Sequence, residues 1–117
     1  MVQEGQVVLF AFPQTDQEAG KLRPALVLRA LPGTHGDWLI CMISSQLHHK
    51  VAHIDEVIRA SDPDFTQTGL KATSLIRVTR IAVVSADLFR GSIGKVGDRR
   101  LERIQNRLAD WLRASKR

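Results

Sequence analysis

The first two-thirds of the chain alternate between short apolar runs and turn-forming segments. Pro13 ends the first run, Pro24 and Pro32 bound the second, and the polar turn 32–37 precedes the third. β-Branched and aromatic runs bounded by Pro and Gly are typical of strands. The predicted strands cover residues 6–12, 25–31, 38–43 and 75–85. Their spacing predicts a small, strongly bent antiparallel sheet or barrel.

The segment 51–59 is ambiguous. Its apolar positions Val51, Ile54, Val57 and Ile58 fit a helical face better than strict alternation, but the segment is short and a turn follows it. We therefore leave its secondary structure open.

The C-terminal segment is predicted to form an amphipathic helix over residues 98–114. Asp98, just after Gly97, is expected at the N-cap. One stripe carries Leu101, Ile104, Leu108, Trp111 and Leu112. Five arginines lie on the other faces, where a solvated surface is more common than an RNA-binding one: Arg99, Arg100, Arg103, Arg107 and Arg113. No repeat or linker divides the chain, so we expect one domain over 1–117, with a barrel to about residue 97.

Composition narrows the class of protein. The 117 residues are 44% hydrophobic and 25% charged, which is ordinary for a folded globule. The apolar runs are far shorter than the roughly 20 residues of a spanning helix, and no basic segment precedes an apolar one at the N-terminus. A single cysteine, Cys41, excludes an intrachain disulfide, and we expect it to be a buried small hydrophobe. These features predict a cytoplasmic location.

The charge balance points to an anionic partner. Lys and Arg number 17 against 12 for Asp and Glu, giving a net charge of +5, and arginine supplies 12 of the 17 cations. Arginine favours forked contacts with phosphate or carboxylate. Nucleic acid, an acidic protein segment, or both are the expected partners.

One stretch, residues 12–28, combines a strand end at Pro13, a polar loop and an Arg23-Pro24 pair that opens the next strand. Proline restricts Arg23 to an extended backbone. The arginine therefore projects from the base of a strand, which suits a cation held in a fixed position.

These residues, with others downstream, resemble the MazF/PemK (Kid) family of toxins from bacterial type II toxin–antitoxin modules. Trp38 to Gln46 is similar to the family's strand that ends in an Ile-Thr-Ser-type turn. Asp64-Phe65 followed by Gly69-Leu70-Lys71 and then Ser74 to Arg77 is similar to another family segment. Residues 93–96 and the closing helix match its tail, so the likeness spans nearly the whole chain.

The resemblance implies a mostly β fold, an SH3-like barrel with a C-terminal helix, working as a homodimer without a cofactor. It implies a growth-inhibiting, metal-independent endoribonuclease that cuts single-stranded RNA at short sequences. It also implies an acidic antitoxin that covers the RNA groove, and contact with operator DNA only through the antitoxin complex.

The resemblance also assigns roles to residues. Arg23 matches the family's loop arginine, and a forked permanent cation suits clamping of the phosphoryl oxygens. Glu18 is the best candidate base for the 2′-OH, with Asp16 weaker. Ser44 stands where threonine is usual and can bond a phosphate oxygen. Arg77 matches a strand arginine that some members use against the phosphate.

Two differences from the family pattern affect which residue can act as the general base. Some members have an aspartate two residues after this strand arginine, where this chain has Thr79, which alternation places on the face of Arg77. The loop histidine that some relatives carry before Arg-Pro is missing. Both departures favour Glu18 as the base. The predicted RNA contacts are Lys21, Gln46, Lys50, Lys71 and Ser74.

Several other sequence features bear on a metal site, on packing and on other functions of the same fold. His48, His49 and His53 cluster, but no cysteine or carboxylate pair completes a metal site, so none is predicted. Trp38 and Trp111 are expected in core or dimer packing. A gyrase-poisoning toxin of the same fold is disfavoured, because that class relies on a Trp-Gly-Ile end. A catalytically weak or inactive nucleic-acid-binding relative stays open, given Ser44 and Thr79.

Overall fold

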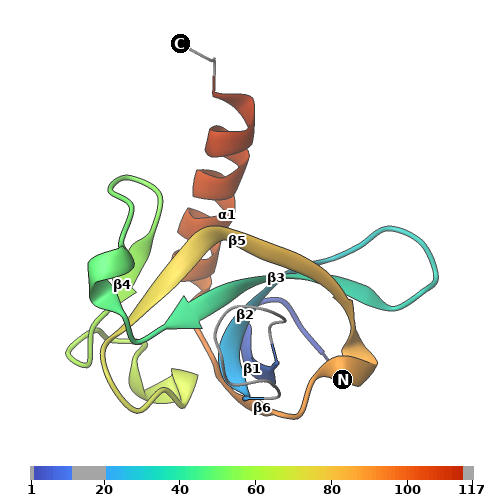
Figure 1. Cartoon of the computed structure of the whole chain (residues 1–117), viewed down its shortest axis with the longest axis horizontal. Helices are drawn as coiled ribbons and strands as arrows, with labels where there is room; N and C mark the ends of the chain where they lie inside the picture. The colour runs from blue at the N-terminus through green and yellow to red at the C-terminus, as the bar shows by residue number, and fades with distance from the viewer. Residues whose placement is uncertain (1, 12–20, 115–117) are drawn as a thin grey trace.

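The chain folds as one curled antiparallel sheet with a single α-helix, as Figure 1 shows for the computed structural model. The structure describes residues 2–11 and 21–114. The strands are β1 (Gln6–Phe10), β2 (Arg23–Ala30), β3 (Asp37–Ser44), β4 (Glu56–Ile58), β5 (Ser74–Ser85) and β6 (Ser92–Lys95), and the helix is α1 (Asp98–Arg113). Three single 3₁₀ turns join them: η1 (Leu47–His49), η2 (Thr66–Thr68) and η3 (Ala86–Leu88). The predicted mostly β fold, a strongly bent antiparallel sheet with a C-terminal helix, is confirmed.

The spatial order of the strands is β4-β5-β3-β2-β1-β6. The central pairs shift register between Val27 and Arg29 and between Cys41 and Met42. Such bulges bend a strand and increase its twist, which curls the sheet. The second shift takes residues 78–80 out of pairing with β3.

Apolar side chains fill both faces of the curled sheet. One cluster lies under α1 and includes Leu26, Cys41, Ile76 and Ile104. The other lies inside the curl and includes Val8, Phe10, Ala25 and Ile40, with Trp38 against it. Cys41 is fully buried, as predicted, and burial raises the pKa of its thiol.

The four predicted strands are confirmed as β1, β2, β3 and β5, with small differences at their ends. The ambiguous segment 51–59 is not helical, and only Glu56–Ile58 forms a strand. Asp55 prevents a helix there because its carboxylate accepts the backbone N–H groups of Val51 and Val78, at 2.9 and 3.0 Å. His53, in the left-handed region at φ 69°, turns the chain just before.

Strand β6 was not predicted, because its four residues carry little apolar pattern. Gly94 explains its position: a Cβ there would collide with backbone atoms of Gln67 and Thr68. Gly69, at φ 74°, ends η2 and lies equally close to the backbone of Ile93. The Gly-Leu-Lys segment thus has a packing role, since its glycine lets η2 lie against β6.

Helix α1 begins at residue 98, as predicted, and ends at Arg113, but its N-cap is Gly97, not Asp98. The carbonyl of Gly97 already accepts the N–H of Leu101, so Asp98 lies in the first turn. Ile104 and Leu108 of the apolar stripe are buried, but Trp111 and Leu112 are 44% and 66% exposed. The reason is visible in Figure 1, where the last turns of α1 extend past the sheet.

Candidate functional site

The sheet register brings three of the four predicted catalytic residues to one face. Arg23 pairs with Phe10, and Ala25 pairs with Met42, so two residues further on Arg23 lies level with Ser44. Ser44 pairs with Leu75 on β5. Residues directly opposite in an antiparallel sheet project to the same side, and residues two apart on one strand do so too. Arg77, opposite Met42, therefore projects to the side of Ser44 and Arg23.

This face has an apolar floor and a polar edge. Phe10, Ala25, Met42 and Leu75 are buried, while Arg23, Ser44 and Arg77 are half-buried at the ends of their strands or near them. The fourth predicted residue, Glu18, and Asp16 lie outside the described residues.

The hydroxyl of Ser44 is fixed by the chain that follows it. Its Oγ accepts the N–H of Gln46 at 3.0 Å. A serine hydroxyl can donate one hydrogen bond while it accepts another. The O–H hydrogen can therefore point at a phosphate oxygen without loss of this backbone contact.

Arg77 carries a buried donor. Within the described part of the chain, its Nε has no hydrogen-bond partner. An unsatisfied buried donor costs about 1–3 kcal/mol. An acceptor from outside the chain would offset this cost, which is the behaviour expected of a ligand-binding arginine.

Two of the clustered histidines, His48 and His49, lie beside this face. His48 and His49 follow Ser44 on η1, with ring centroids 4.3 Å apart. Partial desolvation, followed by the positive fields of His48, Arg77 and Arg80, lowers the pKa of His49. Its imidazole is therefore neutral near pH 7 and able to accept a proton. No group of three metal-binding side chains occurs in residues 2–11 and 21–114.

The predicted RNA contacts divide into two sets. Lys21, Gln46, Lys50 and Lys71 are exposed. Ser74 is buried, and its hydroxyl donates to the carbonyl of Ala72 at 2.8 Å. Ser74 is three residues before Arg77 and so projects to the opposite side of β5. The structure does not bring it to the face of Arg23.

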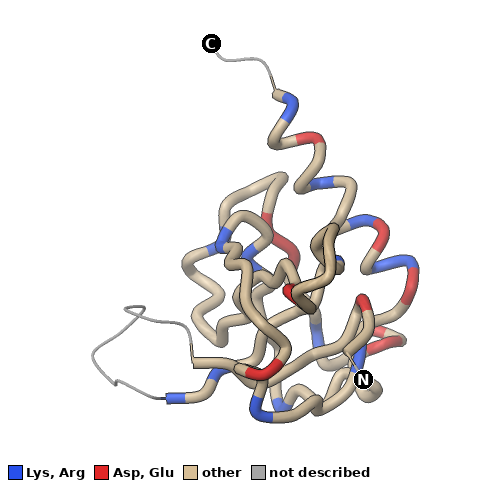
Figure 2. The backbone as a smooth tube through the Cα atoms, turned by 90° about the vertical axis from the view of Figure 1, so that its right-hand side faces the viewer, with Lys and Arg blue, Asp and Glu red and all other residues tan. Residues whose placement is uncertain are grey.

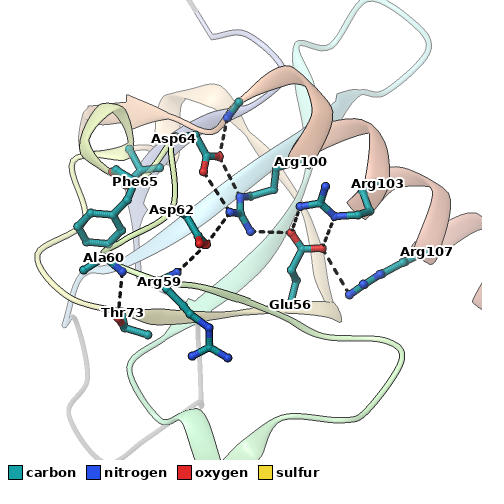
Figure 3. Close-up of polar contacts among 12 residues, drawn as sticks. Glu56, Arg59, Ala60, Asp62, Asp64, Phe65, Thr73, Arg100, Arg103 and Arg107 are labelled. Atoms are coloured by element: carbon teal, nitrogen blue, oxygen red, sulfur yellow. Dashed lines mark hydrogen bonds and ion pairs between the residues drawn. The ribbon is translucent and has the colours of Figure 1, made fainter.

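A second polar site, which the sequence did not predict, lies between α1 and the β4 edge (Figure 3). Arg100, expected on a solvated helix face, is instead 7% exposed. It donates to Glu56 at 2.6 Å, to Asp62 at 2.9 Å and to Asp64 at 2.9 and 3.0 Å. Arg103 and Arg107 also reach Glu56, so we call these six residues the ion-pair cluster. The motif Asp64-Phe65 thus has a structural partner in the helix.

The ion-pair cluster joins α1 to the segment 56–64. Asp64 also accepts the N–H of Gly97 at 2.9 Å, directly before the helix. The side-chain hydrogen bond from Arg100 is the main cause that lowers the pKa of Asp64. The sequence shows Arg100, Arg103 and Arg107 at spacings of three and four on one side of the helix. It does not show which acidic residues contact them.

Comparisons with known proteins agree with this architecture. Residues 3–112 match the family described as PemK-like, MazF-like toxin of type II toxin–antitoxin system. No curated protein is similar enough in sequence to count as a relative. No helix in the described ranges is long and apolar enough to cross a membrane.

Solved structures share the fold at low sequence identity. A mycobacterial endoribonuclease in complex with its cognate antitoxin has a TM-score of 0.70 at 16% identity, with 100% of both chains covered. MazF from Deinococcus radiodurans has a TM-score of 0.69 at 22% identity, over 95% of this chain and 96% of that one. In the MazE–MazF complex of the same organism the values are 0.69 and 19%, over 97% of each chain. The chain belongs to the PemK-like, MazF-like toxins of type II toxin–antitoxin systems.

Proposed function

We propose that this toxin is a metal-independent endoribonuclease that cuts single-stranded RNA by attack of the substrate's own 2′-OH. The observation that carries the proposal is the placement of Arg23, Ser44 and Arg77 on one face of the sheet by strand register. Two forked cations and a hydroxyl donor are the groups needed around a phosphorane, whose charge grows in the transition state.

The reaction requires two proton transfers. The 2′-oxygen forms a bond to phosphorus as its proton passes to a base, and the P–O5′ bond breaks as the leaving oxygen receives a proton. Arg23 and Arg77 stay charged throughout and bind the non-bridging oxygens, while Ser44 donates a hydrogen bond. Glu18 is the proposed base. His49, neutral and close to Arg77, is the next candidate.

The family membership supports two partners. We propose an acidic antitoxin segment that competes with RNA for this face, since one structurally similar protein is a mycobacterial endoribonuclease in complex with its cognate antitoxin. We also propose a homodimer, because Trp111 and Leu112 leave apolar surface on the projecting end of α1. Light scattering that gives a single species of 13.1 kDa at micromolar protein would contradict the dimer.

The experiment for the activity is cleavage of single-stranded RNA in excess EDTA, with the product ends mapped. Attack by the 2′-OH predicts 2′,3′-cyclic phosphate and 5′-hydroxyl ends, at a rate that chelation does not change. Activity that disappears with EDTA and returns with Mg²⁺ would contradict the mechanism. Binding of RNA without turnover would favour the alternative of an inactive nucleic-acid-binding relative.

A further inference from the structure

The surface beside the ion-pair cluster is hollowed into a groove that the proposed cleavage chemistry does not use. The groove has a volume of about 650 Å³ and is bounded by the segment 50–63 and helix α1. Its lining holds five Lys and Arg residues against three Asp and Glu residues. Figure 2 shows the basic residues spaced along α1 and the acidic ones between them.

The three carboxylates in the lining are already occupied by donors of the chain itself. Asp55 accepts two backbone N–H groups and is 3% exposed. Glu56, 7% exposed, accepts from Arg100 and Arg103. Asp62 accepts from the backbone of Arg59 and from Arg100. The groove therefore offers few unused acceptors.

Four of the five cations of the lining, all but the buried Arg100, have donors to spare. Arg103 uses Nε and Nη2 on Glu56, and its side chain is 48% exposed. Arg107 bonds the carbonyl of Asp55 through Nη1 and is 33% exposed. A guanidinium has five donors, so each keeps several for a ligand. Within the described ranges, the exposed side chains of Lys50 and Arg59 form no ion pair, and Figure 3 shows the guanidinium of Arg59 turned away from the carboxylates.

The groove is also preorganised. The Glu56 carboxylate contacts the guanidinium groups of Arg103 and Arg107, so binding would order few additional rotamers. A surface with fixed, unused cationic donors and occupied acceptors fits a ligand that supplies several anionic oxygens at intervals. A phosphodiester backbone has this chemistry.

We propose that this groove is a second, sequence-independent binding site for the phosphates of single-stranded RNA, outside the cleavage site. The inference rests on the proposed function. The connection between the sites is the segment that leaves β3 at Ser44 and reaches the groove at Lys50, six residues on. Since β4 is the edge strand beside β5, a strand of RNA can pass around this edge from Arg77 to Arg59. The groove would hold substrate and leave the chemistry to the other face.

The test compares RNA binding at two lengths. The probes are 2′-O-methyl oligonucleotides of about 4 and about 16 nucleotides, the range of site sizes on small single-strand-binding domains. They keep the phosphates but lack the attacking hydroxyl, so binding is measured apart from cleavage. The test variant is Arg59→Gln with Arg103→Gln. The control, Arg99→Gln with Arg113→Gln, removes the same charge from exposed helix positions outside the groove.

We expect the test variant to bind the long probe more weakly than the wild type does. The slope of log K against log salt should become shallower by about 0.7 for each phosphate contact removed, and therefore by about 1.4 for the two substitutions. The short probe and the control variant should keep the wild-type slope. Equal weakening of both probes, no change for the long probe, or no binding of the long probe by the wild type would each overturn the proposal. If the test variant binds both RNA probes as the wild type does but no longer binds an acidic peptide, the groove belongs to a protein partner, and the proposal is overturned as well.

A thermal melt of each variant separates loss of the groove from loss of the fold. If Arg103→Gln unfolds the protein, Arg59→Gln alone serves, because the Arg59 side chain takes no part in the ion-pair cluster. Its slope should fall by about 0.7. Failure of RNA cleavage with length-dependent binding intact would contradict the proposed function and leave this inference standing.

Discussion

Removal of Arg100 tests how strongly the ion-pair cluster stabilises the fold. Arg100→Ala deletes hydrogen bonds to Glu56, Asp62 and Asp64 and leaves three carboxylates with fewer donors. Breaking a buried ion pair typically costs about 3–5 kcal/mol, because the remaining charge is left without compensation. Here Glu56 keeps two other arginines and Asp64 keeps the Gly97 N–H, so we expect the low end of that range, about 3 kcal/mol.

The assay is urea unfolding of the wild type, Arg100→Ala and the control Arg103→Ala. Arg103 is 48% exposed, so its ion pair should contribute no more than about 1 kcal/mol. At roughly 4 °C per kcal/mol for a chain of this size, Arg100→Ala should lower Tm by about 12 °C. A loss below about 1 kcal/mol, equal to that of the control, would show that burial of Arg100 does not strengthen its ion pairs.

The same cluster predicts how stability depends on pH. The pKa of Asp64 is lowered in the folded state, first by the side-chain hydrogen bond from Arg100. Its contribution is therefore complete above the unfolded pKa of about 3.9 and is lost as pH falls through the lower folded value. Urea midpoints measured down through this window should fall less steeply for Arg100→Ala. Parallel curves would show that Asp64 does not depend on Arg100.

Three further changes test the site and its support. Ser44→Ala should slow cleavage about tenfold, equivalent to one hydrogen bond of roughly 1.4 kcal/mol, and Ser44→Thr should hold or raise the rate; identical kcat for Ser44→Ala and wild type would exclude the hydroxyl from the reaction. Glu18→Gln should lower kcat and remove the acidic limb of its pH profile; if the profile is unchanged, His49→Gln becomes the test of the base. Gly94→Ala should destabilise the fold by about 1–3 kcal/mol in urea unfolding, because its Cβ would meet backbone atoms that cannot move aside; wild-type stability would contradict this close approach.

Local pattern predicted the long elements but not the short ones. Strands β1, β2, β3 and β5 each carry five or more residues rich in apolar side chains, so their periodicity is visible. Strands β4 and β6 have three and four residues, and their place is set by Asp55 and by the backbone contacts of Gly94, which are tertiary features.

For the candidate site, too, only part could be predicted from the sequence. The family likeness identified Arg23, Ser44 and Arg77 one by one, whereas strand register, known only from the structure, places them on one face. The burial of Arg100 escaped prediction because a charged helical position normally faces water. Its partners are 36 to 44 residues away in the sequence, and no local pattern connects them.

If Arg23 binds the reacting phosphate, replacing it with alanine should slow RNA cleavage without unfolding the protein. Arg23 is half-buried at the start of β2, so its loss opens no core cavity, and Tm should stay near that of the wild type. Its charge is needed most as the phosphorane forms, so single-turnover cleavage of single-stranded RNA in EDTA should fall by orders of magnitude, mainly in kcat. Arg23→Lys should recover only part of the rate, because an ammonium cannot make a forked contact. Cleavage by Arg23→Ala at the wild-type rate, with the same Tm, would contradict the assignment of the active site to this face.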